Sequence, residues 1–196
     1  MGIYNRMFKN EKEAERFFET YLQPYENDAY QLILQYVKDP HLAEDLKQEA
    51  VYKAMKMAHQ MRNRNYSRAW FLKIAVNEAK AYYRKKRNMP ETIPLEECSQ
   101  ELYRQLPSAL DELIRQHDAT VLKEAIQQLD TETGIIFWLH VDRHDTFEQI
   151  GEIMGMRTKT VCSRYYRGRE KVIAYLLKET ASGKSEDRER PNLFVF

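Results

Sequence analysis

The sequence predicts an all-α protein built from two small helical domains that are joined by an acidic linker. Glycine and proline each occur only 6 times in 196 residues, so positions that break helices are rare. No stretch alternates apolar and polar residues for long enough to indicate a strand, whereas apolar residues recur at helical spacing in several long segments. We predict domains over residues 11–88 and 119–177, a linker over 89–118 and a disordered tail over 178–196.

The first domain begins with a segment rich in aromatic and apolar residues, from 11 to 37. The Gln23–Pro24 step interrupts it and predicts two helices, because the residue before a proline avoids the helical conformation. Residues 38–41 are expected to form a turn. A further helix is predicted over residues 42–61, since small and apolar side chains recur there at steps of three and four: Ala43, Leu46, Ala50, Ala54, Met57 and Met61.

The opposite face of the 42–61 helix is polar and has the same period. Its members are Asp45, Gln48, Glu49, Tyr52 and Lys56. Interactions between side chains of the same helix do not require such a polar face. The pattern by itself does not indicate what the face binds.

A polar run over residues 62–65 predicts a loop, and Ser67 is expected to cap a helix over 68–88. One face of this helix is apolar and another is almost purely cationic. Aromatic rings beside cations suit the unstacked bases of single-stranded nucleic acid, but a solvated basic face explains the cations equally well. The rings are those of Tyr66, Trp70, Phe71, Tyr82 and Tyr83, of which we assign Tyr82 and Tyr83 to the core.

The charge changes sign over residues 89–118, where acidic residues outnumber basic ones. Pro90, Pro94 and Pro107 interrupt helix formation in the same segment. We interpret it as the acidic linker.

The second domain is predicted to start with a helix near Ala119, and Asp130 or Thr131 is expected to cap the apolar helix that follows. Residues 146–172 then have the signature of a winged-helix-like helix-turn-helix. Gly155 permits the tight turn between its two helices. Phe147, Ile150 and Met154 are expected to form the buried face of the first helix, and Val161, Tyr165, Gly168 and Val172 that of the second.

The outward face of that second helix predicts duplex DNA as its ligand, because a recognition helix contacts base edges and phosphates in the major groove. A solvated basic face is the alternative, and it is disfavoured by a cluster of cations with a single acid among them. Thr160, Ser163 and Arg164 are expected near base edges, and Arg157, Arg167 and Lys171 on phosphates, with Thr158, Lys159 and Arg169 nearby.

No pattern for catalysis is present in the sequence: it lacks a nucleophile elbow, a P-loop and a dinucleotide-binding turn. His140 and His144 stand four residues apart, a spacing that puts two imidazoles on one helix face and suits zinc. The H-E-x-x-H pattern is missing, so a small metal-dependent hydrolase is the weaker alternative. We predict no catalytic residue, no metal and no cofactor.

The sequence also indicates where the protein acts. No run approaches the roughly 20 apolar residues that a membrane span needs, and charges occupy the place of a signal peptide's apolar core. Cys98 and Cys162 belong to no C-x-x-C pair, which fits a reducing compartment, although their spacing leaves a disulfide between them open. A cytoplasmic protein without membrane insertion is expected.

The net charge of +1, from 31 basic and 30 acidic residues, conceals a segregation of charge. The helix over 68–88 and the segment 156–177 are strongly basic, and the linker is acidic. Because opposite segments cancel in the sum, near-neutrality does not argue against a nucleic-acid partner.

Three motifs follow one another along the chain: HLAEDLKQEAVYKAM with its D-x-x-Q-E helix, SRAWFLKIAVNEAKAYYRKKRN with W-x-x-x-I-A-x-N, and the helix-turn-helix ending in TVCSRYYRGREKV. Their order resembles the extracytoplasmic-function (ECF) sigma factors of the sigma-70 superfamily, over about residues 17–176. The resemblance implies a subunit that binds bacterial core RNA polymerase, recognises two promoter elements and promotes transcription of a specific regulon. An anti-sigma factor is a further partner that the resemblance leaves open.

The resemblance also implies roles for the residues. The first domain would be region 2, which binds polymerase and melts the promoter, and the second would be region 4, which reads the upstream element as duplex. The polymerase-binding residues would be Asp45, Gln48, Glu49 and Tyr52; those on the opened strand Arg62, Asn63, Arg64, Trp70, Lys73, Asn77, Lys80 and Arg84; and those on the duplex Arg157, Thr158, Lys159, Thr160, Ser163, Arg164, Arg167 and Lys171.

The alternative is a stand-alone helix-turn-helix transcriptional regulator. Such a protein would need no exposed face at Asp45, Gln48 and Glu49, and it would usually dimerise.

Overall fold

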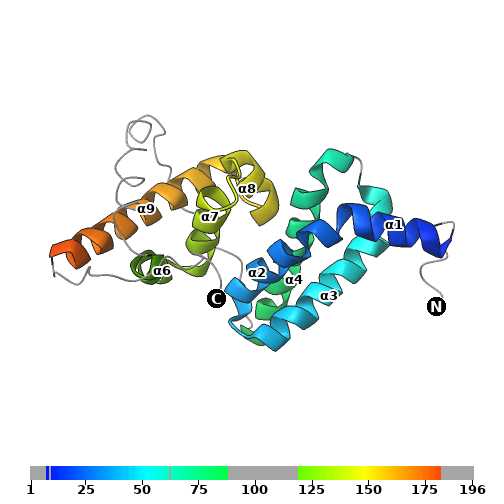
Figure 1. The fold of residues 1–196 in the computed structure, drawn as a ribbon, viewed down its shortest axis with the longest axis horizontal. Coiled ribbons are helices and arrows are strands. Elements are labelled where there is room, and N and C mark those ends of the chain that lie inside the picture. The colour runs from blue at the N-terminus through cyan, green and yellow to red at the C-terminus, as the bar shows by residue number, and fades with distance from the viewer. Residues whose placement is uncertain (1–7, 9, 62, 88–118, 182–196) are drawn as a thin grey trace. The chain divides into compact units, whose positions relative to one another are not determined.

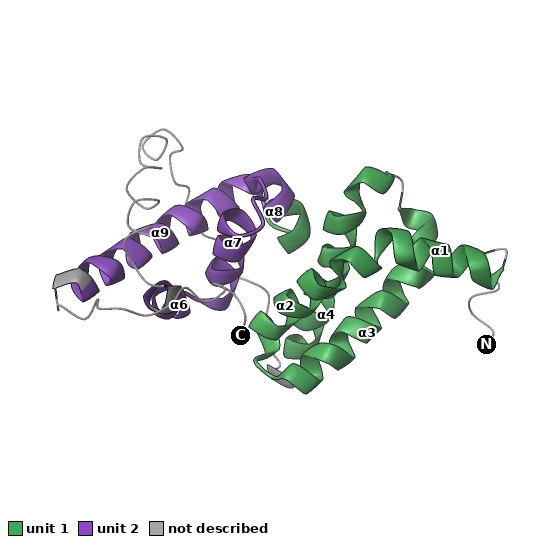
Figure 2. Cartoon of the chain, in the orientation of Figure 1, with its two compact units in different colours: residues 1–93, 151–156 green, residues 94–150, 157–196 purple. Residues whose placement is uncertain are grey.

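The computed structural model describes residues 8, 10–61, 63–87 and 119–181. The predicted linker, Arg62, Cys98 and the tail from residue 182 onward lie outside the described residues. Every element within the described ranges is an α-helix or a 3-10 helix, which confirms the all-α prediction (Figure 1). The chain divides into two compact units, residues 1–93 with 151–156 and residues 94–150 with 157–196 (Figure 2).

The first unit opens with two helices separated at Pro24, as predicted. Helix α1 spans Glu11–Tyr21, and the 3-10 helix η2 spans Gln23–Tyr25 with the proline in its first turn. Helix α2 then spans Glu26–Val37. A proline at the start of a helical turn loses no hydrogen bond there, so it ends one helix and begins the next turn.

Helix α3 spans Pro40–Lys56 and differs from the predicted 42–61 at both ends. It begins earlier because the Asp39 side chain accepts hydrogen bonds from the backbone N–H groups of His41 and Leu42, at 3.0 and 3.2 Å. It ends earlier, at Lys56: the N–H of Met57 is shared between the carbonyls of Lys53 at 2.9 Å and Ala54 at 3.1 Å, and the short 3-10 helix η3, Ala58–Gln60, follows.

Helix α4 spans Ser67–Arg87, preceded by the 3-10 helix η4, Arg64–Tyr66. Ser67 is therefore the first residue of the helix and not its cap. Helix α2 packs against both α3 and α4, which also pack on each other. Residues 32–37 are consequently all buried, and α3 and α4 supply further core residues: Ala43, Ala50, Ala54, Met55, Phe71, Leu72, Ile74, Ala75, Val76 and Ala79.

Residues 119–181 contain α6 (Ala119–Gln127), α7 (Thr131–Val141), α8 (Phe147–Met154) and α9 (Thr158–Ala181). They belong to the second unit except for residues 151–156, which include the end of α8 and are grouped with the first. Helix α9 packs against α6 and α7. The apolar run 135–139 of α7 is buried throughout, and Asp130 caps this helix as predicted. Helices α8 and α9 form the predicted helix-turn-helix, with Gly155 in the turn at φ +68°, a backbone conformation that favours glycine.

Two details of the second unit differ from prediction. Helix α9 continues through Ala181, so the first residues of the predicted tail are helical. No strand occurs among the described residues, so the β-wing of a winged helix is not found there, because the chain after the turn stays in one long helix. No described helix is both long and apolar enough to cross a membrane.

Candidate functional site

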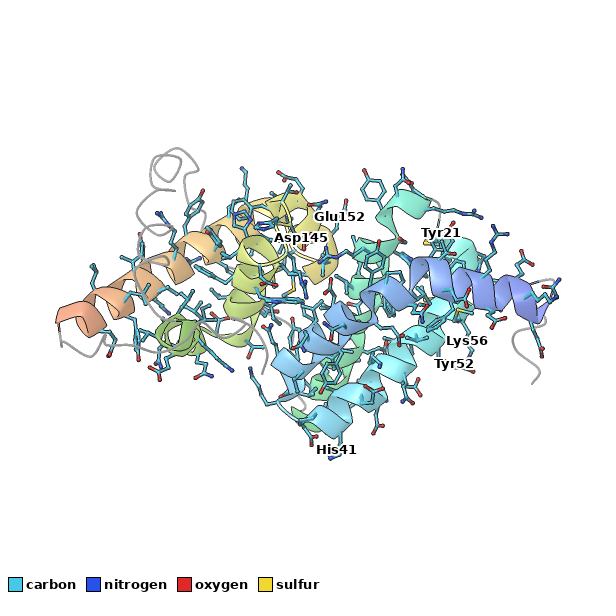
Figure 3. The ribbon with its side chains drawn as sticks, viewed as in Figure 1. Tyr21, His41, Tyr52, Lys56, Asp145 and Glu152 are labelled. Carbon is cyan, nitrogen blue, oxygen red and sulfur yellow. The ribbon has the colours of Figure 1, made fainter. Side chains whose placement is uncertain are left out.

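The polar face of α3 is accessible in the first unit. Asp45, Gln48 and Glu49 are exposed and Tyr52 is partly exposed; at spacings of three and four, they lie on one side of the helix. The ammonium of Lys56 lies 4.1 Å from the centre of the Tyr52 ring, near the C-terminal end of α3 (Figure 3). This face presents carboxylates, an amide and a cation-covered aromatic ring, and charged groups of this kind can select a partner surface of complementary charge.

Neighbouring side chains on α3 hold part of this face in place. The Nε2 of Gln48 donates to Glu44 at 3.3 Å, and Lys47 pairs with the same carboxylate at 2.8 Å. The hydrogen bond from Lys47 lowers the pKa of Glu44, which therefore stays ionised at neutral pH.

The basic face of α4 is only partly as predicted. Lys73, Asn77 and Arg84 are exposed, whereas Trp70 and Lys80 are partly buried. Among the rings that we considered beside these cations, Phe71 is fully buried in the core. Tyr82 and Tyr83, which we assigned to the core, are partly exposed and form an edge-to-face pair with ring centres 6.0 Å apart.

The segment before α4 presents a surface residue that the predicted site omits. Asn63, Arg64 and Asn65 are exposed, and the Tyr66 side chain next to them is 53% exposed. Few large apolar side chains of the described residues are as exposed. The sequence did contain a signal for this, because Tyr66 directly follows the polar run 62–65, which predicts a loop.

The start of α9 carries the exposed cations of the helix-turn-helix. Arg157, Lys159, Arg167 and Lys171 are exposed, and Thr158 and Thr160 are partly exposed. The N-terminal part of a recognition helix is the part that enters the major groove. The structure places Arg157 directly before α9 and the other five residues along its first four turns, each at least partly exposed.

Three residues that we expected on or near this outward face are not free to contact DNA. Ser163 is only 5% exposed, because Arg167 folds back over it and donates to its Oγ at 2.8 Å and to its carbonyl at 3.3 Å. Arg164 turns toward α7, where it pairs with Asp130 at 3.1 Å and Glu132 at 3.0 Å, and its side chain is 17% exposed. Arg169 is 5% exposed, on the inner side of the helix.

The carboxylate of Asp130 joins these contacts to the beginning of α7. It accepts hydrogen bonds from the Thr133 backbone N–H at 3.1 Å and the Thr133 hydroxyl at 2.6 Å. Burial by itself would raise the pKa of Asp130, but these hydrogen bonds, together with the charges of Arg164 and Lys171, lower it below the ordinary value. Asp130 thus stays ionised and ties α9 to the cap of α7.

We expect Asp130→Asn, which keeps the cap but removes the charge, to destabilise the second unit by roughly 0.5–1 kcal/mol at pH 7. The folded pKa is lowered, so the charge stabilises fully above the unfolded value of about 3.9 and ceases to do so as pH falls through the folded value. The difference in unfolding free energy between the variant and the parent should therefore disappear in acid. This difference is measured by unfolding followed by Trp138 fluorescence in a Trp70→Phe background. A difference that stays constant as the pH falls would contradict the prediction.

The two histidines that suggested a zinc site have other surroundings. The His140 ring stacks on Phe147 with centres 4.4 Å apart and meets Tyr165 edge-on at 4.7 Å. Its Nδ1 lies 2.9 Å from the carbonyl oxygen of Asp145. His144 is exposed, with φ +57°. In the part of the chain that the structure describes, no group of three or more His, Cys, Asp or Glu residues could hold a metal ion.

Comparison with known proteins gives consistent matches. Residues 21–89 match the family model of sigma-70 region 2. The chain is 28% identical over 181 residues to RNA polymerase sigma factor SigV of Bacillus subtilis, covering 89% of this chain and 99% of that protein. It is 25% identical over 174 residues to the RNA polymerase sigma-H factor of Pseudomonas aeruginosa, covering 84% and 90%.

A solved structure has the same fold. The sigma factor RpoE of Bartonella quintana, in complex with the anti-sigma factor NepR, aligns with a TM-score of 0.58 at 20% identity, covering 82% of this chain and 96% of that one. The family match falls on the unit that contains α3 and α4, and both relatives are matched over at least 90% of their lengths, so the chain carries a sigma-70 region 2 at residues 21–89 and resembles RNA polymerase sigma factors along most of its length.

Proposed function

We propose that this protein binds core RNA polymerase, recognises promoter DNA through two elements and directs initiation of transcription of a specific set of genes. The observation that carries the proposal is the exposed face of α3, Asp45, Gln48 and Glu49, within the segment that matches sigma-70 region 2. A stand-alone helix-turn-helix regulator would need no such face in addition to its DNA-binding helix.

Each unit has a proposed part in this function. Residues 11–88 bind polymerase through α3 and hold the opened strand through α4 and the segment before it. Residues 119–177 read the upstream element as duplex, and the linker 89–118 connects the two within the polymerase. We propose no catalytic role for any side chain, and we propose that the protein acts in the cytoplasm, where the polymerase transcribes.

For the duplex reader we propose contacts through the exposed residues of α9. Arg164 is assigned a structural role, since both of its acidic partners belong to the chain itself. Ser163 becomes available to DNA only if Arg167 swings away from it. The proposed contacts are thus Arg157, Thr158, Lys159, Thr160, Arg167 and Lys171.

Regulation by an anti-sigma factor is a further proposal. It is supported by the likeness in fold to RpoE, which was solved in complex with NepR.

Run-off transcription with core polymerase on genomic DNA fragments tests the proposed function. We expect transcripts that begin at defined positions and require both the core enzyme and this protein. DNA binding by the protein alone, without any transcript in the presence of core enzyme, would support the stand-alone regulator instead.

For the opened strand we add Tyr66 to the proposed site, because an exposed ring beside cations can stack on an unpaired base. Tyr66→Ala should weaken binding of the single-stranded promoter element by the polymerase holoenzyme roughly 5- to 150-fold, corresponding to about 1–3 kcal/mol per stacked base. Tyr66→Phe should retain the affinity. Fluorescence anisotropy of a labelled non-template strand measures both.

The matched control for Tyr66 is Leu177→Ala in the other unit, which removes a side chain that is also 53% exposed. It should leave strand binding unchanged. Equal affinities for parent and Tyr66→Ala would remove Tyr66 from the site.

A further inference from the structure

A row of aromatic rings runs from the N-terminal helix to the segment that precedes α4. The Phe8 and Phe17 rings have centres 5.5 Å apart, and those of Phe17 and Tyr21 are 5.3 Å apart. At the end of the row, the guanidinium carbon of Arg64 lies 5.5 Å from the centre of the Tyr21 ring. This is within the range of a cation–π interaction, and it links the last residue of α1 to the first residue of η4.

Tyr21 is well anchored on the side away from Arg64. Leu22, the next residue, is fully buried, and its N–H donates to the carbonyl of Phe18 at 2.9 Å. The Phe17 ring contacts the Tyr21 ring from the preceding turn of the helix. The buried Leu22 thus holds the backbone at the end of α1, and the Phe17 ring lies against the side chain of Tyr21, which is labelled in Figure 3.

The segment 63–66, in contrast, has little anchorage of its own. All four of its side chains are exposed, so none is held by packing in the core. Within the segment, the Asn63 side chain accepts from the N–H of Asn65 at 3.0 Å, and the Asn63 carbonyl accepts from the N–H of Tyr66 at 3.2 Å. These contacts shape the turn, and the Ser67 N–H, which donates to the Arg64 carbonyl, joins it to α4. The Arg64–Tyr21 contact joins it to α1.

The geometry also leaves Arg64 able to bind. A guanidinium that lies over a ring face is attracted through its plane, while its N–H donors point outward from its edge. Contact with Tyr21 is therefore compatible with hydrogen bonds from Arg64 to a phosphate or a base.

We propose that Tyr21 is a positioning residue for the strand-binding segment 63–66: it holds Arg64, and through Arg64 it sets the place of the exposed Asn63, Asn65 and Tyr66. The inference rests on the proposed function for its consequence in DNA binding, but the contact itself can be tested without polymerase. Tyr21 touches no DNA in this proposal.

The first experiment uses the full chain alone and measures hydrogen–deuterium exchange at the amides of Asn65 and Tyr66. Tyr21→Leu should speed their exchange about two- to fivefold, the range that corresponds to an exposed cation–π interaction. Tyr21→Phe, which keeps the ring face, should exchange like the parent. Phe18→Leu is the matched control, since it also replaces a partly exposed aromatic ring on α1 by leucine.

The second experiment uses the holoenzyme and the labelled non-template strand of a promoter mapped by run-off transcription. Tyr21→Leu should weaken binding about two- to fivefold, Tyr21→Phe and Phe18→Leu should not, and Tyr21→Leu should have no further effect in an Arg64→Gln background. The last result distinguishes positioning through Arg64 from a general loss of stability.

Three results would overturn the positioning role: unchanged exchange in Tyr21→Leu, equal effects of Phe18→Leu and Tyr21→Leu, or effects of Tyr21→Leu and Arg64→Gln that multiply. Failure of the parent holoenzyme to bind the strand would instead count against the proposed function, and the exchange experiment would still decide whether Tyr21 holds the segment.

Discussion

Replacement of Asp45, Gln48 and Glu49 together by alanine is expected to weaken binding of core RNA polymerase by about 100-fold or more. A hot-spot residue near the centre of an interface costs about 2 kcal/mol or more on truncation, and about 1.4 kcal/mol corresponds to a factor of ten, so one or two hot spots among the three residues account for the expected loss. The helix itself should remain, because the three side chains are exposed and alanine favours helix at least as well as the residues it replaces. Affinity is measured with labelled protein and purified core enzyme, and helix content by circular dichroism.

The matched control is Glu15→Ala with Glu19→Ala on α1, where both glutamates are exposed. Like the triple variant, it removes two negative charges from the first unit, so it reports any effect of net charge alone. We expect the control to bind polymerase like the parent. If the triple variant also bound normally while its fold was intact, α3 would not be the polymerase-binding face.

Gly168→Ala is expected to destabilise the second unit by about 1–3 kcal/mol, the usual cost of overpacking a core. A Cβ at Gly168 would lie 2.6 Å from Cγ2 of Thr133 and 3.2 Å from Cε2 of Phe137. Neither can easily move away, because Thr133 is 5% exposed and bonded to Asp130, and Phe137 is 1% exposed. Loss of stability should appear as a lower midpoint in thermal unfolding followed by Trp138 fluorescence, with Trp70 replaced by Phe.

Gly134→Ala on α7 supplies the control for this substitution. A Cβ at Gly134 has nothing within 4 Å, and alanine inside a helix is favoured over glycine by roughly 0.5–1 kcal/mol. It should therefore raise the midpoint slightly. Equal midpoints for Gly168→Ala and the parent would mean that α7 and α9 can separate at no cost, contrary to the close approach at Gly168.

Much of the architecture was predictable because it depends on local periodicity. The apolar spacing in α2, α3, α4 and α9 reports which face of each helix is buried, and the break at Pro24 and the turn at Gly155 follow from the backbone limits of proline and the freedom of glycine. The polar face of α3 was predictable for the same reason. Helix ends were less so: Asp39 extends α3 by a capping hydrogen bond that the periodic pattern does not register.

The assignments that failed concern long side chains whose contacts the spacing of apolar residues does not reveal. Arg164 and Asp130 are 34 residues apart in sequence and 3.1 Å apart in the fold, so an arginine on the predicted outward face becomes part of the domain's own framework. Ser163 is contacted by the side chain of Arg167, one turn further along the same helix; a helical wheel places the two residues side by side but does not give the direction of the arginine side chain. The hypothesis of a zinc site at His140 and His144 is also weaker, because the His140 ring packs against the rings of Phe147 and Tyr165.

The pattern of residues along the chain established the helical class, the helix-turn-helix, the segregation of basic and acidic segments and the resemblance to sigma factors. Each of these depends on residues that lie close together in the sequence. Only the tertiary fold decided which cations are available to DNA and which are bound to the protein itself. The length of an arginine side chain is the physical reason: its guanidinium can reach carboxylates, carbonyls or rings on another helix, as Arg164 and Arg64 do, and spacing along one helix does not reveal that partner.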